Sequence, residues 1–217
     1  GHSYWFPAQS TAQWPKHWAG NIFFSVHPSK EQRHKKQRTR IQDVAAINCL
    51  FAEIDGKDMV KPSAAELATA LASIEAEDRA RLAAGTITRM TPPSVMERKA
   101  RLLAKEQVFK ANIAHYNALA YQHVMGMTPA PSVVIHSGGG YHLYWLLAET
   151  FMLATAEDRE RAKQLQRGWV TFVGGDDGAK DLTRVLRPFG THNKKPKYAP
   201  NYPTVTAQRL DLTIEYN

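Results

Sequence analysis

The sequence is organised around one stretch, Val133-Val-Ile-His-Ser137-Gly-Gly-Gly-Tyr-His142-Leu-Tyr-Trp-Leu146. Apolar segments typical of strands flank three consecutive glycines, which predicts a β-hairpin with a turn where the backbone can approach a ligand closely. His142 follows the last glycine by two residues and could donate a hydrogen bond to a phosphate at this turn. A glycine-rich turn is a weak signal by itself, and a lone histidine on a strand is usually structural, so other parts of the chain must complete a phosphate site.

Alternation along the second strand of this hairpin assigns its side chains to two faces. One face carries His142, Tyr144 and Leu146, and the other, which is expected to be core, carries Leu143, Trp145 and Leu147.

A further strand is predicted over Ile47-Asn-Cys-Leu-Phe-Ala-Glu-Ile-Asp55, which is densely apolar and is followed by Gly56. Glu53 and Asp55 lie on the same face of such a strand, roughly 7 Å apart along it. A divalent cation with oxygen ligands, Mg²⁺ or Mn²⁺, fits between two such carboxylates. The alternative is a strand end entering solvent, but a glutamate two residues inside a buried strand is less ordinary, which favours metal binding.

Composition is that of a soluble globular chain of 217 residues, long enough for one large domain with a sizeable core. The 28 Lys and Arg residues against 20 Asp and Glu give a net charge of +8, which favours polyanionic partners. The single cysteine excludes a disulfide framework and a Cys-rich zinc site. Since no bilayer-length apolar run or secretory signal pattern occurs, we expect a cytoplasmic protein without a membrane partner. Residues 1–3 are typical of a tag remnant, and the abrupt end at Asn217 suggests a region excised from a longer protein.

Helices are predicted over 63–84, where Ser63 and Glu66 form a capping box, over about 95–125, and over about 155–173. One or two strands should close the fold between 204 and 216. The chain is expected to form a single domain, with 57–131 as a largely helical insertion or connection.

Positive charge is concentrated at two places that could contact a nucleic-acid backbone. The run from 30 to 40 contains six Lys or Arg residues and one Glu, and the alternative is a solvated, mobile charge run. The candidates for nucleic-acid binding are Lys35, Lys36, Arg38, Arg40, Lys194 and Lys195.

A third informative stretch runs from Asp176 to Lys195, where acidic residues precede a cluster of cations and polar donors. Carboxylates for an ion beside guanidinium and ammonium groups for phosphate oxygens are what a metal–polyphosphate site needs. The alternative is a charged surface loop with local ion pairs.

Three separated elements, taken together and in this order, resemble the motifs of the archaeo-eukaryotic primase superfamily. They are Glu53-Ile-Asp55, Ser137-Gly-Gly-Gly-Tyr-His142, and Asp181 followed by Arg184-Val-Leu-Arg187-Pro-Phe-Gly-Thr-His-Asn193. The resemblance covers roughly 40–200 and is greatest to primase-polymerases of phages, plasmids and bacterial mobile or defence systems. One departure is that many members have Asp where this chain has Glu53.

The resemblance implies an α+β fold with an RRM-like antiparallel or mixed sheet, an N-terminal α/β unit and flanking helices. It also implies template-directed nucleotidyl transfer with two Mg²⁺ or Mn²⁺ ions, a single-stranded DNA template and primer, and NTP or dNTP. A helicase or an accessory priming domain is an expected partner. By the same resemblance, Glu53, Asp55 and Asp181 are the catalytic metal ligands, and the incoming nucleotide is bound by Ser137, Gly138, Gly140, His142, Arg184, Arg187 and Asn193.

Two alternatives stay open from the residues. A replication-initiator nuclease would need a His-hydrophobic-His metal motif, and the sequence contains no such triplet. A non-catalytic RRM-like nucleic-acid-binding module would need exposed aromatic residues on central strands, and Tyr144 is a candidate for one.

Overall fold

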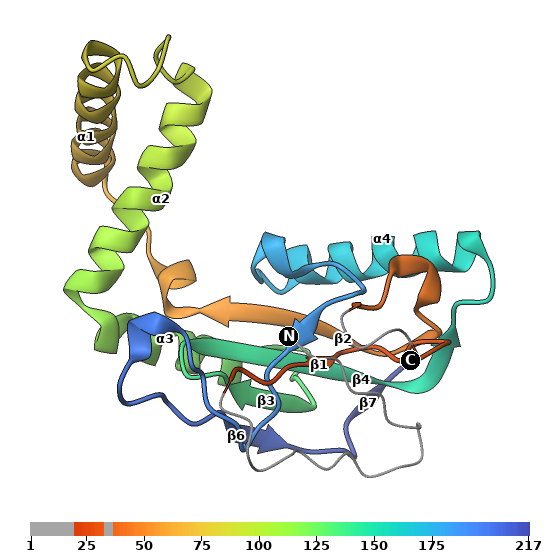
Figure 1. Cartoon of the computed structure of the whole chain (residues 1–217). Helices are drawn as coiled ribbons and strands as arrows, with labels where there is room; N and C mark the ends of the chain where they lie inside the picture. The colour runs from red at the N-terminus through yellow and green to blue at the C-terminus, as the bar shows by residue number, and fades with distance from the viewer. Residues whose placement is uncertain (1–19, 33–36) are drawn as a thin grey trace. The chain divides into compact units, whose positions relative to one another are not determined.

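The computed structural model describes residues 20–32 and 37–217, so the tag-like residues 1–3 and the candidates Lys35 and Lys36 lie outside the described residues. The fold class is α+β, as the sequence predicts (Figure 1). The chain packs as two compact units, one formed by the described residues up to Asp55 together with Gln122–Asn217, and the other by Gly56–Tyr121. No helix in the described ranges is long and apolar enough to cross a bilayer.

A five-stranded sheet is the centre of the first unit, with the order β2-β4-β3-β6 and with β7 paired parallel to β4. The hairpin expected from the sequence is β3 and β4, and the carboxylate-bearing strand β2 is its antiparallel neighbour. A separate two-stranded sheet joins β1 and β5. The strands are β1 (Phe24–Ser25), β2 (Ala46–Asp55), β3 (Val133–His136), β4 (Gly140–Met152), β5 (Val185–Leu186), β6 (Thr206–Leu210) and β7 (Glu215–Tyr216).

Both faces of β4 are buried over its first six residues, although the sequence assigned only one face of this strand to the core. Helix α4 (Ala156–Phe172) lies along one face (Figure 1), where Trp169 meets the edge of Trp145 at a centroid distance of 5.2 Å. On the other face Tyr144 belongs to an apolar cluster with Phe51 and with Leu186 of β5. Tyr144 is therefore 7% exposed, and residues from β1 and β5 pack over it.

The free edge of β2 is closed by a side chain of α4. Gln166 is fully buried, accepts a hydrogen bond from the Phe51 N–H at 3.3 Å and donates one to the Phe51 carbonyl at 2.8 Å. The amide thus replaces a neighbouring strand at Phe51, where it pairs both backbone groups.

Gln166→Leu should lower the free energy of unfolding by about 2–5 kcal/mol, because it leaves these two buried backbone groups without partners. Urea denaturation measures this loss, with Gln164→Leu as the control because Gln164 is exposed on the same helix. An equal effect of both substitutions would contradict the role assigned to Gln166.

His27 is a buried group whose protonation should couple to folding. It is 2% exposed, packs against Phe51, and has no hydrogen-bond partner at either ring nitrogen among the described residues. Burial lowers the pKa of His27 from 6.5 to about 4. The unfolded chain therefore takes up this proton at a higher pH than the folded chain does.

The free energy of unfolding should accordingly decrease as the pH falls from about 6.5 to 4, with His27 accounting for up to about 3 kcal/mol of the loss. Urea denaturation at several pH values checks this, and His27→Phe should show a shallower decrease over the same interval. Parallel curves for the two proteins would rule out His27 as the cause.

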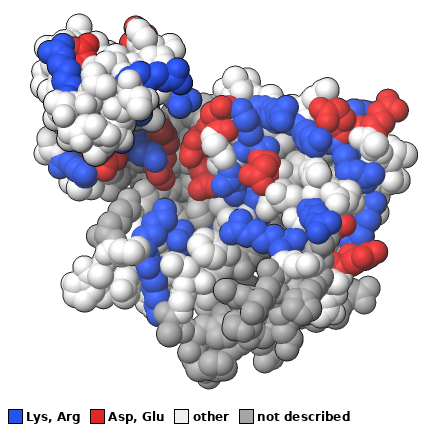
Figure 2. Space-filling view, turned by 45° about the horizontal axis from the view of Figure 1, so that its top comes forward, with Lys and Arg blue, Asp and Glu red and all other residues white. Residues whose placement is uncertain are grey.

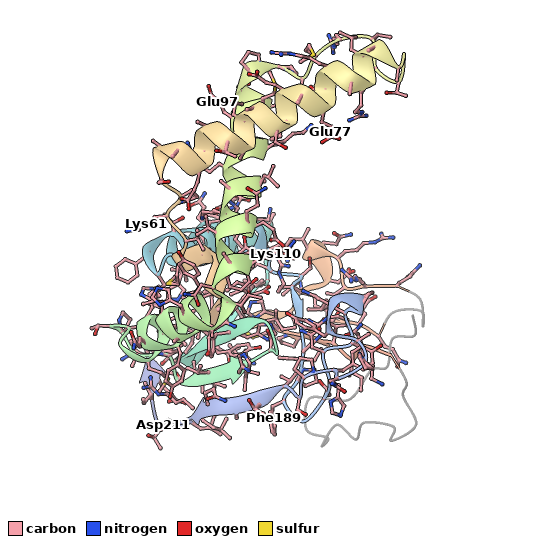
Figure 3. All side chains as sticks on the ribbon, turned by 90° about the vertical axis from the view of Figure 1, so that its left-hand side faces the viewer. Lys61, Glu77, Glu97, Lys110, Phe189 and Asp211 are labelled. Atoms are coloured by element: carbon pink, nitrogen blue, oxygen red, sulfur yellow. The ribbon has the colours of Figure 1, made fainter. Side chains whose placement is uncertain are left out.

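The second unit is built on α1 (Ala64–Ala83) and α2 (Pro93–Ala111), which pack through Ala70, Ile74, Ala100 and Ala104. The expected capping box is present: the Ser63 hydroxyl accepts from the Glu66 N–H, and the Glu66 carboxylate accepts from the Ser63 N–H. Glu77 and Glu97 point away from the helix–helix contact (Figure 3).

The single helix expected over 95–125 is wrong, because the structure has two helices there. The chain leaves the helical conformation at Asn112, with φ −149° and ψ 63°, between α2 and α3 (Ile113–Met125). The Asn112 side chain accepts a hydrogen bond from the His115 N–H at 3.3 Å, so it caps the start of α3 instead of continuing α2.

Candidate active site

The antiparallel register of β2 and β4 brings the first two sequence motifs together. Glu53 lies opposite His142, and Asp55 lies opposite Gly140. The Glu53 carboxylate is 3.9 Å from Nε2 of His142. Two motifs almost ninety positions apart in the sequence are therefore neighbours at one end of the sheet.

The turn between β3 and β4 is closed by Ser137. Its backbone N–H and its hydroxyl both donate to the carbonyl oxygen of Gly140, at 2.7 and 3.0 Å. Gly138 has φ +80°, a conformation that favours glycine. The hydroxyl proton of Ser137 is thus used within the turn, and its role in nucleotide binding stays a prediction.

Each glycine of this turn is approached closely by another part of the same chain. A Cβ on Gly138 would lie 2.6 Å from the Pro203 side chain, and one on Gly140 would lie 1.8 Å from Oδ1 of Asp55. On Gly139 it would collide with the Tyr198 hydroxyl. Side chains of this same chain therefore occupy the space that the missing Cβ atoms leave beside the turn. Asp55 in particular contacts the turn at Gly140.

The third motif reaches Glu53 through Arg184. The Arg184 guanidinium is 3.7 Å from the Glu53 carboxylate and 3.0 Å from the Asp181 carboxylate, and it donates to the carbonyl oxygen of Gly178. Asp181 also accepts from the Thr183 hydroxyl at 2.8 Å. Arg184 thus links the acids of the first and third motifs.

Asn193 connects the third motif to the glycine turn. Its side-chain N–H donates to the Ser137 carbonyl oxygen at 2.8 Å, and its own backbone N–H donates to the Pro203 carbonyl oxygen at 2.9 Å. Asn193 is 1% exposed. Its side chain thereby contributes to the shape of the turn.

Arg187 is almost completely buried, at 7% exposed. Its guanidinium donates to Oδ1 of Asn21 and lies over the Phe23 ring, with 4.6 Å between the guanidinium carbon and the ring centroid. Burial lowers the pKa of Arg187. Asn21 and Phe23 precede β1, and no local sequence signal marks them as site residues.

The site has an acidic part and a basic part. Burial raises the pKa of Glu53, and the neighbouring carboxylates of Asp55 and Asp176 raise it further, against the lowering effect of Arg184. Burial lowers the pKa of His142 to about 3, and the nearby cations Arg187, Lys195 and Arg184 add to that shift. His142 is therefore neutral at pH 7, and its contact with Glu53 is not an ion pair.

Asp176 is a residue of this cluster that the sequence did not single out. Its backbone N–H donates to the Glu53 carbonyl oxygen at 2.8 Å, which ties the start of the third stretch to β2. Only the general acidity of the stretch pointed to it.

The nucleic-acid-binding candidates are only partly gathered at the site. Lys195 is close enough to influence Glu53 and His142, and the Lys194 backbone N–H donates to Asn21. Arg38 and Arg40 are exposed. In Figure 2, Lys and Arg atoms lie interspersed with Asp and Glu on the face that is turned forward.

A surface cavity of about 430 Å³ adjoins Asp181. Its cations are largely balanced by acids, since Lys180 pairs with Asp177 and Lys163 pairs with Glu160. The remaining lining side chains include Ile41, Arg167 and Leu182.

The carboxylates of this site are chemically suited to bind a metal ion, but their side chains are not arranged around a common metal position. Glu53, Asp55 and Asp181 carry the carboxylate oxygens that Mg²⁺ and Mn²⁺ prefer. Within 20–32 and 37–217, however, no group of three or more His, Cys, Asp or Glu side chains is placed to hold a metal ion. The positive charge that joins Glu53 to Asp181 is the guanidinium of Arg184.

Comparison with known proteins gives one structural likeness. The sequence matches no protein-family model and no curated protein. Among solved structures, the chain is similar to the AEP domain of the primase-polymerase (PrimPol) of cyanophage S-2L, with 12% sequence identity and a TM-score of 0.43. The alignment covers 91% of this chain and 65% of that chain, so the chain spans about two thirds of that structure's length.

Proposed function

We propose that this chain is a template-dependent nucleotidyltransferase, a primase-polymerase that adds nucleotides to a primer 3′-hydroxyl. The observation that carries the proposal is the convergence of three sequence-distant motifs. Glu53 of β2 approaches His142 of β4 and Arg184, and Arg184 pairs with Asp181. A cluster of acidic side chains beside a cluster of basic ones suits a reaction that joins a hydroxyl group to a polyphosphate.

The basic part would bind the triphosphate of the incoming nucleotide. Arg187, Lys195 and Arg184 all raise the positive potential at His142. No Asp or Glu of the described residues forms an ion pair with Arg187, and the undescribed segments 1–19 and 33–36 contain neither residue type. A buried cation without an acidic partner favours an anionic ligand. The neutral imidazole of His142 can donate one hydrogen bond to a phosphate oxygen.

The acidic part would hold the divalent ions. When bound by Asp55, Asp181 and Glu53, two Mg²⁺ or Mn²⁺ ions would supply Lewis acidity at the reacting phosphate. In the reaction the primer 3′-oxygen forms a bond to the α-phosphorus, and the bond from that phosphorus to the β-phosphate oxygen breaks. Pyrophosphate leaves with the electron pair, and the hydroxyl proton passes to water. The side chains of this site orient the two reactants and balance their charge.

A non-catalytic RRM-like module is less well supported. Base stacking on such a sheet needs exposed aromatic side chains. Tyr144, the candidate for that role, is 7% exposed and packed beneath residues of β1 and β5. It is therefore a core residue and is not available to stack on a base.

A primer-extension assay on a single-stranded DNA template tests the proposal. Purified protein with Mg²⁺ or Mn²⁺ should lengthen a labelled primer, and EDTA should stop the reaction. Parallel reactions with NTP, with dNTP and without primer establish the sugar preference and whether chains are started de novo. Binding of the template without any extension in either metal would instead support the non-catalytic module.

His142→Ala should raise the KM for the incoming nucleotide roughly tenfold and change kcat less, because a phosphate loses one hydrogen-bond donor. Steady-state primer extension over a range of nucleotide concentrations measures the effect. His123→Ala, at an exposed histidine of the same unit, is the control. An unchanged nucleotide dependence in His142→Ala would remove His142 from the nucleotide site.

A further inference from the structure

The segment that precedes β1 contacts the basic part of the site. The Oδ1 atom of Asn21 accepts hydrogen bonds from Nη2 and Nε of Arg187, at 3.2 and 3.4 Å. The same oxygen accepts from the Lys194 backbone N–H at 2.8 Å. One neutral amide oxygen thus fixes both the guanidinium of Arg187 and the start of the Lys194-Lys195 pair.

Phe23 completes this support from the same segment. Its ring lies beneath the Arg187 guanidinium at 4.6 Å, a distance at which a cation is attracted to an aromatic face. The ring itself is 44% exposed, so its position is not explained by burial in the core. A planar guanidinium held by an edge contact and a face contact has little freedom to rotate.

The chemistry of these two contacts is informative. A carboxylate at position 21 would pair with Arg187, whereas an amide oxygen and an aromatic ring orient the guanidinium without forming an ion pair, and the Glu53 carboxylate acts on it only from beyond ion-pair contact. Burial at 7% exposed makes that charge costly unless an anion binds it. This is the arrangement expected of a guanidinium kept ready for a phosphate.

We propose that Asn21 and Phe23 are positioning residues for nucleotide binding, which act through Arg187 to hold its guanidinium toward the triphosphate. The proposal rests on the proposed function for the identity of the anion. It assigns part of the nucleotide site to a segment more than 160 residues away from Arg187 in the sequence.

The test is a double-mutant cycle on the KM for dATP, measured by Mn²⁺-dependent extension of a primer on an oligo(dT) template. Asn21→Ala should raise this KM about tenfold with kcat changed less than twofold, because a hydrogen bond to a charged group is lost. Phe23→Leu, which keeps an apolar side chain but removes the aromatic face, should raise it several-fold. In an Arg187→Ala background Phe23→Leu should add no further increase, and Asn21→Ala should add only the smaller part that its contact with the Lys194 N–H contributes.

Asn48→Ala, at an exposed asparagine of β2, is the control for the substitution itself. Thermal melting of every variant separates a lost contact from a lost fold. The proposal is overturned if Asn21→Ala and Phe23→Leu leave the KM unchanged, or if their effects add fully to that of Arg187→Ala. Failure of the wild-type protein to extend any primer would count against the proposed function itself. The wild-type reaction without any variant is sufficient to detect that outcome.

Discussion

Asp55→Ala and Asp181→Ala are each expected to reduce the rate of nucleotide addition by at least about 10²- to 10³-fold, the range for loss of one preorganised charge-stabilising group. Asp55 belongs to the carboxylate pair on β2, and Asp181 is joined to that pair through Arg184. Both side chains reach solvent, so their removal should leave the fold intact. Primer extension measures the rate, and circular dichroism checks the fold.

The matched control for these variants is Asp177→Ala. Asp177 lies four residues before Asp181, is 81% exposed at its side chain, and pairs only with Lys180 among the ion pairs of the described residues. We expect this variant to retain the wild-type rate. Substantial extension by a folded Asp55→Ala or Asp181→Ala protein, free of contaminating polymerase, would refute the assignment of that acid.

Gly140→Ala should have an effect of similar size without changing any charged residue. The new Cβ would lie 1.8 Å from the Asp55 carboxylate oxygen and 2.9 Å from the Ile54 carbonyl oxygen, so Asp55 has to move. A displacement of about 1 Å in a reacting site can cost about 10²-fold in rate. Primer extension normalised to the folded fraction measures the loss.

Gly168→Ala is the control for that substitution, because the added Cβ on this helical glycine would meet no atom within 4 Å apart from the adjacent backbone of its own helix. This change should leave the rate unaltered and stabilise α4 by up to about 1 kcal/mol through helix propensity. A folded Gly140→Ala protein with wild-type activity would show that the position of Asp55 against the turn is unimportant.

Local pattern was sufficient for the main elements of the fold. The apolar density of 47–55 predicted β2, and the glycines between two apolar runs predicted the β3–β4 hairpin. The capping box at Ser63 predicted the start of α1, and a helix predicted over about 155–173 corresponds to α4. Each of these signals acts within a few residues, so the sequence carries it directly.

Two expectations were wrong, the single helix over 95–125 and the single buried face of β4, because the local sequence signals there are weak. Residues 95–125 have helical propensity throughout, but the Asn112 side chain can cap a new helix as readily as its backbone can continue the old one. Burial of both faces of β4 depends on β1 and β5, which are two residues long each and carry almost no pattern of their own.

The contacts that shape the candidate site could not be predicted from local sequence patterns, because they join residues that are far apart in the sequence. The resemblance of three motifs pointed to Glu53, His142 and Asp181, but not to the way Arg184 links two of them. Asn21 meets Arg187 across 166 positions of sequence, and Tyr198 meets the glycine turn through a tertiary contact. Such pairings follow from the packed sheet and leave no trace in spacing or composition.

Single-nucleotide incorporation tests the central claim most directly. A primer on four single-stranded templates that differ only in the next base is offered one nucleotide at a time, with Mn²⁺. A nucleotidyltransferase of the kind proposed adds the complementary nucleotide in each case, and the Asp55→Ala protein adds it at least about 10²-fold more slowly. Absence of addition on all four templates, or addition that ignores the template base, would contradict a template-directed site built from these three motifs.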